Sequence, residues 1–277
     1  MTTTMELQRR RSPTVRSDKM EAAFFDLDKT LLPGSSLFPL AREMYRQQFF
    51  DLGDIARMAA DQFAFILLGT EAEGRIDRAR DASLEAIRGR EREEIIQVGR
   101  SVAREEIIPR LYPQAVELLS RHKLAGREVY ICSSSPQDYL ALLADELGIN
   151  GVLGTRAEVV DDHYTGRLDG PLCHGDEKAR RVSELAATRD IDLTRSFAYS
   201  DSINDLPMLE LVGTPVAMNP DHKLHALARK RGWQVLDFRT ARRRTMVASV
   251  AGVGAAAVGA LGYALGYALG RSRAASA

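Results

Sequence analysis

Residues 22–30 read Ala-Ala-Phe-Phe-Asp-Leu-Asp-Lys-Thr, and this stretch decides the fold. Its apolar half predicts a short buried strand, and Asp26 and Asp28 stand where that strand gives way to a loop. Four further short apolar runs predict strands over 129–132, 197–199, 215–218 and 233–238. Helical patterns alternate with them over 113–124, 178–187 and 206–211. This alternation predicts an α/β protein with a doubly wound parallel sheet, whose ligands sit beyond the carboxyl ends of its strands.

Two segments interrupt this alternation. Residues 41–110 show no strand-like pattern, and residues 71–106 hold 18 charged side chains among apolar ones, which predicts amphipathic helices with solvated faces. We interpret 41–110 as a helical unit inserted after the first strand. Residues 155–170 predict a β-hairpin, and the Asp161-Asp162-His163 stretch near its turn is typical of turn chemistry rather than of a metal site.

The two ends of the chain differ from its body. Residues 1–20 are polar and basic without a following apolar run, which predicts a disordered leader and not a secretory signal. Residues 246–270 contain no charge, and as a helix they are long enough to cross a membrane. The face formed by Gly262, Gly266 and Gly270 would allow close helix–helix approach and possible homo-oligomers. A flexible tail and a helix buried in an oligomer remain alternatives.

Charge and cysteine content suggest the compartment. The arginines that precede residue 246 outnumber the two that follow residue 270, so we expect the catalytic body on the cytoplasmic side, anchored to the inner face of the cell membrane. The 277 residues include 38 basic and 38 acidic side chains, which argues against a nucleic-acid partner. Two cysteines, Cys132 and Cys173, cannot form a disulfide framework and suit a reducing compartment.

Polar residues recur where the predicted strands end. Asp26 and Asp28 are two close carboxylates, which call for Mg²⁺ or for a division into nucleophile and general acid. Ser133-Ser134-Ser135-Pro136 follows the strand at 129–132 and suits a phosphate oxygen or a helix N-cap. Lys178 alone reads as a surface charge. Asp201 and Asp205 follow the strand at 197–199 and can face one cation or form an Asx turn and a helix cap.

The order of these four motifs resembles that of the haloacid dehalogenase superfamily. The similarity is to its subfamily IB, the phosphoserine-phosphatase-like branch, and covers roughly residues 21–238. The resemblance implies a Rossmann-like core over 21–40 and 111–240, a C1-type α-helical cap over 41–110 and, in this chain, an additional C-terminal hydrophobic helix over 246–270. It also implies a phosphatase that uses Mg²⁺ and forms an aspartyl phosphate.

The resemblance assigns roles to individual residues. Asp26 would be the nucleophile, and Asp28 would protonate the leaving group and then activate water. The substrate phosphate would be bound by five residues: Thr30, Ser133, Ser134, Lys178 and Asn204. Mg²⁺ would be held by Asp26, the Asp28 carbonyl and Asp201. Asp205 would support either the metal or Lys178.

Two departures from the phosphoserine phosphatase pattern bear on the substrate. Ser35 stands where those enzymes usually carry a Glu that binds the substrate amine, and Ser134-Ser135 replaces the usual Gly-Gly. We therefore expect a small cytosolic phosphomonoester that need not be phosphoserine. A phosphatase of a membrane-derived monoester, such as a lysolipid or glycerol phosphate, and a non-catalytic membrane-anchored binding protein are the alternatives.

Overall fold

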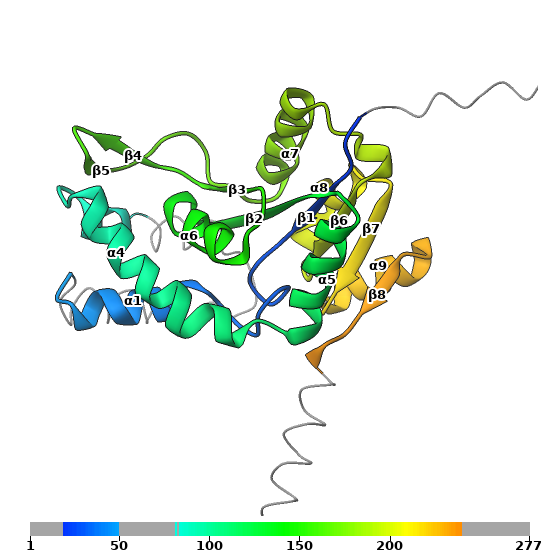
Figure 1. The fold of residues 1–277 in the computed structure, drawn as a ribbon, viewed down its shortest axis with the longest axis horizontal. Coiled ribbons are helices and arrows are strands. Elements are labelled where there is room, and N and C mark those ends of the chain that lie inside the picture. Colours follow the sequence, from blue (N-terminus) through cyan, green and yellow to red (C-terminus); the bar gives the residue numbers. More distant parts are fainter. Residues whose placement is uncertain (1–18, 50–80, 82, 240–277) are drawn as a thin grey trace, which may run out of the picture.

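A six-stranded parallel sheet forms the centre of the molecule (Figure 1). The computed structural model describes residues 19–49, 81 and 83–239. The sheet has the order β3-β2-β1-β6-β7-β8. Its strands are β1 (Ala22–Phe25), β2 (Glu128–Pro136), β3 (Gly151–Thr155), β6 (Phe197–Ser200), β7 (Thr214–Met218) and β8 (Gln234–Leu236). The predicted α/β fold with a doubly wound parallel sheet is therefore confirmed.

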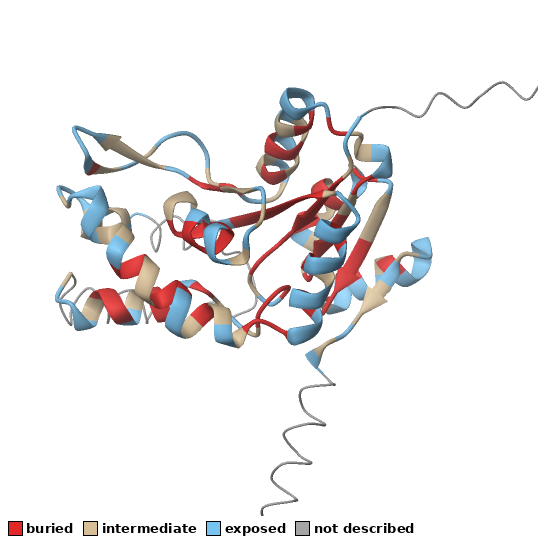
Figure 2. Ribbon diagram, viewed as in Figure 1, coloured by how far each residue is buried: buried red, intermediate tan, exposed pale blue. Residues whose placement is uncertain are grey.

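Helices cover both faces of this sheet (Figure 1). The helices in the described residues are α1 (Leu37–Arg46), α4 (Arg92–Val102), α5 (Pro113–Leu124), α6 (Gln137–Leu147), α7 (Asp176–Arg189), α8 (Leu206–Glu210) and α9 (His222–Arg231). The apolar core on one face is closed by α5 and α6, and the core on the other face is closed by α7, α8 and α9. Figure 2 shows the buried strands between these layers.

The central strand β1 shows why this arrangement follows from the sequence. Its side chains alternate between the two cores, with Ala23 and Phe25 in one and Ala22 and Phe24 in the other. All four are 0% exposed. Burying a Phe side chain contributes about 1.5–3 kcal/mol, so both phenylalanines hold β1 in the middle of the sheet. The loop that leaves β1 at Asp26 therefore starts from a fixed point.

The helix α4 lies against both α1 and the core helix α6. It continues through a π-helical turn (Ala103–Ile107) and a 3₁₀ turn (Ile108–Arg110) into the core. Arg92 pairs with Asp138 at 2.6 Å near one end of α6, and Arg104 pairs with Glu146 at 2.6 Å near the other. The cap boundary predicted at residue 41 falls inside α1, because that helix starts at Leu37.

The predicted hairpin consists of β4 (Ala157–Val160) and β5 (His163–Leu168). Asp161 and Asp162 form its turn with φ of 48° and 60°, a left-handed conformation that aspartate tolerates. The predicted turn chemistry is therefore confirmed. The hairpin also contacts the cap region, since Tyr164 exchanges backbone hydrogen bonds with residues 89–90 and Arg92 donates to the Asp162 carbonyl.

Several boundaries differ from the predictions. β2 extends to Pro136 with an irregular register to β3 after Cys132, so Ser133-Ser134-Ser135 lies within the strand rather than after it. β3 and α9 were not predicted. The predicted leader over 1–20 ends earlier, because Met20 pairs with Ile191 beside β1. The rest of the leader, the predicted transmembrane segment 246–270 and its glycine face lie outside the described residues. Within the described part of the chain, no helix combines the length and apolar character needed to cross a membrane.

Candidate active site

The first and fourth motifs meet at the carboxyl ends of β1 and β6, which are neighbours in the sheet. Asp26 continues β1, and its backbone N–H donates to the Tyr199 carbonyl of β6 at 2.9 Å. The Thr30 hydroxyl donates to Asp26 Oδ2 at 2.9 Å and accepts the backbone N–H of Asp201 at 3.0 Å. One hydroxyl thus bridges the two motifs and orients the Asp26 carboxylate.

Lys178 is a buried cation between two carboxylates. Its Nζ lies 2.7 Å from Asp26 Oδ1 and 2.8 Å from Asp205 Oδ2, and the Ser200 hydroxyl donates to the same Asp205 oxygen at 2.7 Å. Burial lowers the pKa of the Lys178 ammonium, but the two carboxylates outweigh it and raise the pKa overall. Burial raises the pKa of Asp26 to about 6, although the Lys178 charge opposes the shift.

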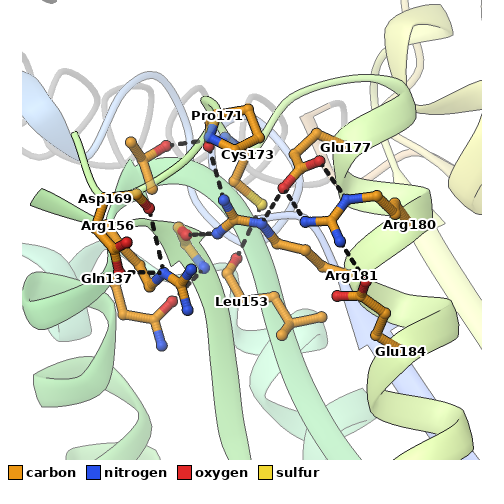
Figure 3. Close-up of polar contacts among 12 residues, drawn as sticks. Gln137, Leu153, Arg156, Asp169, Pro171, Cys173, Glu177, Arg180, Arg181 and Glu184 are labelled. Carbon is orange, nitrogen blue, oxygen red and sulfur yellow. Dashed lines mark hydrogen bonds and ion pairs between the residues drawn. The ribbon is translucent and has the colours of Figure 1, made fainter.

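A polar network positions the helix that carries Lys178 (Figure 3). One turn after Lys178, the Arg181 guanidinium is 8% exposed and bonds Glu177 at 2.6 Å. It also donates to the Gly154 carbonyl in β3 and to the Pro171 carbonyl, the latter at 2.7 Å. Because Arg181 joins α7 to the end of β3 and to the segment before α7, the Lys178 backbone is held against the sheet.

The second motif is tied to the segment before α7. Ser133 is 1% exposed, and its hydroxyl accepts the backbone N–H of Ser135 at 3.2 Å. Ser134 is exposed, and its carbonyl accepts from the Thr155 hydroxyl at 2.7 Å. The same Thr155 oxygen accepts the backbone N–H of Cys173 at 3.2 Å. The Thr155 hydroxyl therefore connects the strand of the second motif to the segment that leads to Lys178.

The predicted metal ligands supply oxygen atoms. Asp26 is 6% exposed and Asp201 9%. Burial and the nearby charge of Asp26 raise the pKa of Asp201 to about 7, and burial raises the pKa of Asp28. Nowhere in the described residues do three or more His, Cys, Asp or Glu side chains form a metal-binding group. The predicted set needs only two carboxylates and the Asp28 carbonyl, and buried carboxylates that repel each other fit a hard divalent cation.

Asp205 and Asn204 of the fourth motif differ in burial. Asp205 is 3% exposed and contacts Lys178 and Ser200, so it supports the lysine, one of its two predicted roles. Asn204 is exposed, and its backbone N–H donates to the Ser202 hydroxyl at 3.2 Å. The structure therefore brings Asp205 into the charged cluster and leaves Asn204 at its surface.

A fifth polar segment was missed in the sequence. Asn219, with φ of 53°, donates through Nδ2 to the carbonyls of Lys29 and Thr30, each at 3.1 Å. Asp221 accepts a hydrogen bond from the backbone N–H of Ile203 at 3.0 Å. Both residues follow the predicted strand at 215–218, just as the recognised motifs follow their strands. Their position after a predicted strand was the signal in the sequence that could have identified them as site residues.

Comparison with known proteins assigns this site to a family. The model of haloacid dehalogenase-like hydrolases matches residues 23–210. The chain belongs to that family. The phosphoserine phosphatase SerB1 of Mycobacterium tuberculosis is 42% identical over 86% of this chain and 78% of its own length. The histidinol-phosphatase of Neisseria meningitidis is 32% identical over 78% of this chain and 98% of its own length.

A solved structure supports the fold of this haloacid dehalogenase-like hydrolase. A protein of unknown function from Bordetella pertussis Tohama I is 31% identical, with a TM-score of 0.70 over 79% of this chain and 99% of its own. The prediction of an enzyme of the haloacid dehalogenase superfamily, similar to phosphoserine phosphatases, is confirmed. The roles of the individual site residues remain predictions.

Proposed function

We propose that this hydrolase cleaves small phosphomonoesters through an aspartyl phosphate on Asp26. One observation carries the proposal: the Asp26 carboxylate is buried between the Lys178 ammonium and the Thr30 hydroxyl, at 2.7 and 2.9 Å. A carboxylate oriented by two donors beside a cation is prepared for nucleophilic attack on an anionic centre. A second carboxyl group, Asp28, lies two residues further along the same loop.

The proposed reaction has two steps that use both carboxyl groups. A carboxylate oxygen of Asp26 attacks the phosphorus atom, and the bond from phosphorus to the ester oxygen breaks. Asp28 gives its proton to that leaving oxygen, and the alcohol departs. Asp28, now ionised, takes a proton from a water molecule, whose oxygen attacks the phosphorus of the aspartyl phosphate. Inorganic phosphate leaves, and the Asp26 carboxylate and the protonated Asp28 are restored.

Positive charge is needed because a phosphate dianion approaches a carboxylate. Lys178 supplies one such charge, and we propose that the Ser133 hydroxyl on β2 donates a hydrogen bond to a phosphate oxygen. We propose that Asp26, the Asp28 carbonyl and Asp201 hold Mg²⁺. When bound, this ion would lower the repulsion between substrate and nucleophile and stabilise charge in the transition state.

The substrates of the relatives and the chemistry of Ser35 suggest which class of phosphate ester this hydrolase accepts. The names of the two relatives above imply phosphoserine and histidinol phosphate as their substrates, and both are phosphate esters of primary alcohols. Ser35 offers no carboxylate for an amine, and its hydroxyl accepts the Leu37 N–H at 3.2 Å. We propose a small phosphate ester of a primary alcohol and no obligatory amine. The membrane-derived ester, the anchor and the self-association rest on residues 246–270 and remain predictions.

Hydrolysis of p-nitrophenyl phosphate by the full chain with Mg²⁺ tests the proposed chemistry. We expect activity that Asp26→Asn abolishes and that Asp145→Asn, at an exposed position on α6, leaves intact. Acid quenching should trap labelled phosphate on the protein as a hydroxylamine-sensitive acyl phosphate. A wild-type chain that is inert with every divalent ion tried would contradict the enzymatic proposal and favour the binding-protein alternative.

A panel of phosphate esters addresses the substrate. We expect phosphoserine, histidinol phosphate and simple alkyl phosphates to differ in kcat/KM, with no requirement for an amine beside the ester. Lysolipid phosphates tested with and without liposomes address the membrane-derived alternative. Faster turnover of the lipid esters than of every soluble ester would favour that alternative over the small-metabolite proposal.

A further inference from the structure

Ser36 departs from the usual behaviour of a serine at a helix N-cap. It occupies the N-cap of α1 and is 0% exposed, yet its side chain makes no capping hydrogen bond to that helix. The side chain of an N-cap serine ordinarily accepts a backbone N–H of the first turn. The hydroxyl instead lies 3.1 Å from the hydroxyl of Ser135 on β2, which is also 0% exposed.

The backbone of Ser36 contacts the proposed general acid. Its N–H donates to Asp28 Oδ1 at 2.7 Å, a short bond to a carboxyl oxygen. This bond engages Oδ1 and limits rotation of the carboxyl group. Because an N–H donates best to an unprotonated oxygen, the proton that the leaving group needs would be on the other oxygen, Oδ2.

These contacts continue to the phosphate-binding strand. The backbone N–H of Ser135 donates to the Ser133 hydroxyl at 3.2 Å. A chain of three hydrogen bonds therefore runs from Asp28 through Ser36 and Ser135 to Ser133. It links the two groups that would act at opposite sides of the scissile bond, the donor to the leaving oxygen and the donor to a phosphate oxygen.

We propose that Ser36 is a positioning residue, which orients the Asp28 carboxyl for proton transfer and fixes it relative to Ser133 on β2. The inference rests on the proposed function. Positioning of a general acid matters most when the leaving group is a strong base, because a weakly basic leaving group departs without a proton. A residue that serves only stability would affect esters of both kinds equally.

The test compares two aryl esters of similar shape, phenyl phosphate and p-nitrophenyl phosphate. Phenolate is a much stronger base than p-nitrophenolate, so kcat/KM for phenyl phosphate depends more on the general acid. Ser36→Pro removes the N–H, and the φ of −76° at this position suits proline. We expect it to lower kcat/KM for phenyl phosphate about tenfold more than for p-nitrophenyl phosphate.

Two further variants complete the experiment with the full chain and Mg²⁺. Ser36→Ala keeps the N–H and loses the hydroxyl, so we expect a smaller change in the same ratio, about threefold. Ser120→Ala, at an exposed position of α5 where the hydroxyl donates to the Val116 carbonyl, should leave the ratio unchanged. An unchanged ratio in a Ser36→Pro protein that melts like wild type would overturn the inference and leave the proposed function standing.

A double-mutant cycle decides the matter if Ser36→Pro does not fold. Ser36→Ala, Ser135→Ala and the double variant should alter the ratio of the two esters by about the same factor, because each breaks one shared link. Ratios that do not change, or that multiply as for independent sites, would overturn the inference. A wild-type enzyme inert toward both esters would instead overturn the proposed function, and this inference with it.

Discussion

Lys178 Nζ lies 2.7 Å from Asp26 Oδ1, and the two side chains are only 3% and 9% exposed. A buried ion pair of this kind balances two costly desolvations, and removing either partner leaves the other uncompensated. Here a second carboxylate, Asp205, shares the same ammonium. We therefore expect both the activity and the stability of the site to depend on this lysine.

Replacing Lys178 by methionine should affect activity and stability together. At pH 8 we expect the free energy of unfolding to fall by about 3–5 kcal/mol, because two buried carboxylates lose their cation. The kcat/KM for p-nitrophenyl phosphate should fall at least about a hundredfold. Urea unfolding and initial rates measure these changes, with Lys230→Met on exposed α9 as the control. A folded variant with wild-type kcat/KM would refute the phosphate-binding role.

Thr30→Val keeps the shape of the side chain and removes its hydroxyl. The Asp201 N–H and Asp26 Oδ2 would each lose their partner at this atom. We expect a loss of about 1–3 kcal/mol in the free energy of unfolding and a weaker affinity for Mg²⁺. Calorimetry of Mg²⁺ binding is the measurement. Thr188→Val, on an exposed part of α7, serves as the control, and equal Mg²⁺ affinity in the two variants would count against the bridge.

The stability of the metal-free enzyme should fall with rising pH through Asp201. Burial, together with repulsion from Asp26, raises its pKa to about 7 from 3.8. The folded state therefore holds the proton more tightly, so this contribution is present at low pH and is lost as pH rises through about 7. Asp201→Asn in EDTA should gain about 1–3 kcal/mol over wild type at pH 8 and little at pH 4.

Magnesium should reverse that comparison at pH 8. The ion would neutralise the repulsion in wild type and stabilise the folded state by mass action, but the neutral amide introduced by Asp201→Asn would be a poorer ligand than the carboxylate. Melting temperatures with EDTA and with excess Mg²⁺ test this. A Mg²⁺-dependent increase of equal size in wild type and variant would show that Asp201 is not a ligand.

The contribution of His122 to stability should increase with pH, opposite to that of Asp201. It is 4% exposed, its Nε2 lies 2.8 Å from the Tyr199 hydroxyl, and burial together with the Arg127 charge lowers its pKa to about 4 from 6.5. The unfolded chain therefore binds the proton more readily, so stability from this residue is full above pH 6.5 and is lost as pH falls toward 4. The expected loss is about 2–3 kcal/mol. In the His122→Gln variant, the free energy of unfolding measured with urea should depend less on pH over this acidic range. An unchanged pH dependence would show that His122 is not its cause.

The sequence predicted those features that are encoded locally. The buried strand at 22–25, the helix at 113–124 and the hairpin carry periodicity or turn residues within a few positions. β3, with the sequence Gly-Val-Leu-Gly-Thr, is short and has two glycines, so its only strong signal is its pairing with β2. The cap boundary predicted at residue 41 falls inside α1, which starts at Leu37 after the N-cap residue Ser36.

The site residues also divide into those that could be predicted from the sequence and those that could not. Asp26, Asp28, Asp201 and Lys178 were found because their order along the chain resembles that of a family, although Asp26 and Lys178 are 152 positions apart. The Ser36 hydroxyl contacts Ser135, 99 positions away, and the Asn219 side chain donates to the Lys29 carbonyl, 190 positions away. No local pattern specifies such contacts, because the close approach of these loops exists only once the sheet has formed.

Thr155, through which the second motif contacts the segment before α7, accepts the backbone N–H of a buried cysteine. Cys132 precedes Ser133, Cys173 donates its N–H to Thr155, and both are 0% exposed with thiol pKa values raised by burial. A native molecule should therefore resist thiol reagents, since both thiols become reactive only when β2 and the segment before α7 open to solvent. The rate of labelling of the two natural thiols would report how often the catalytic framework opens, without any introduced probe.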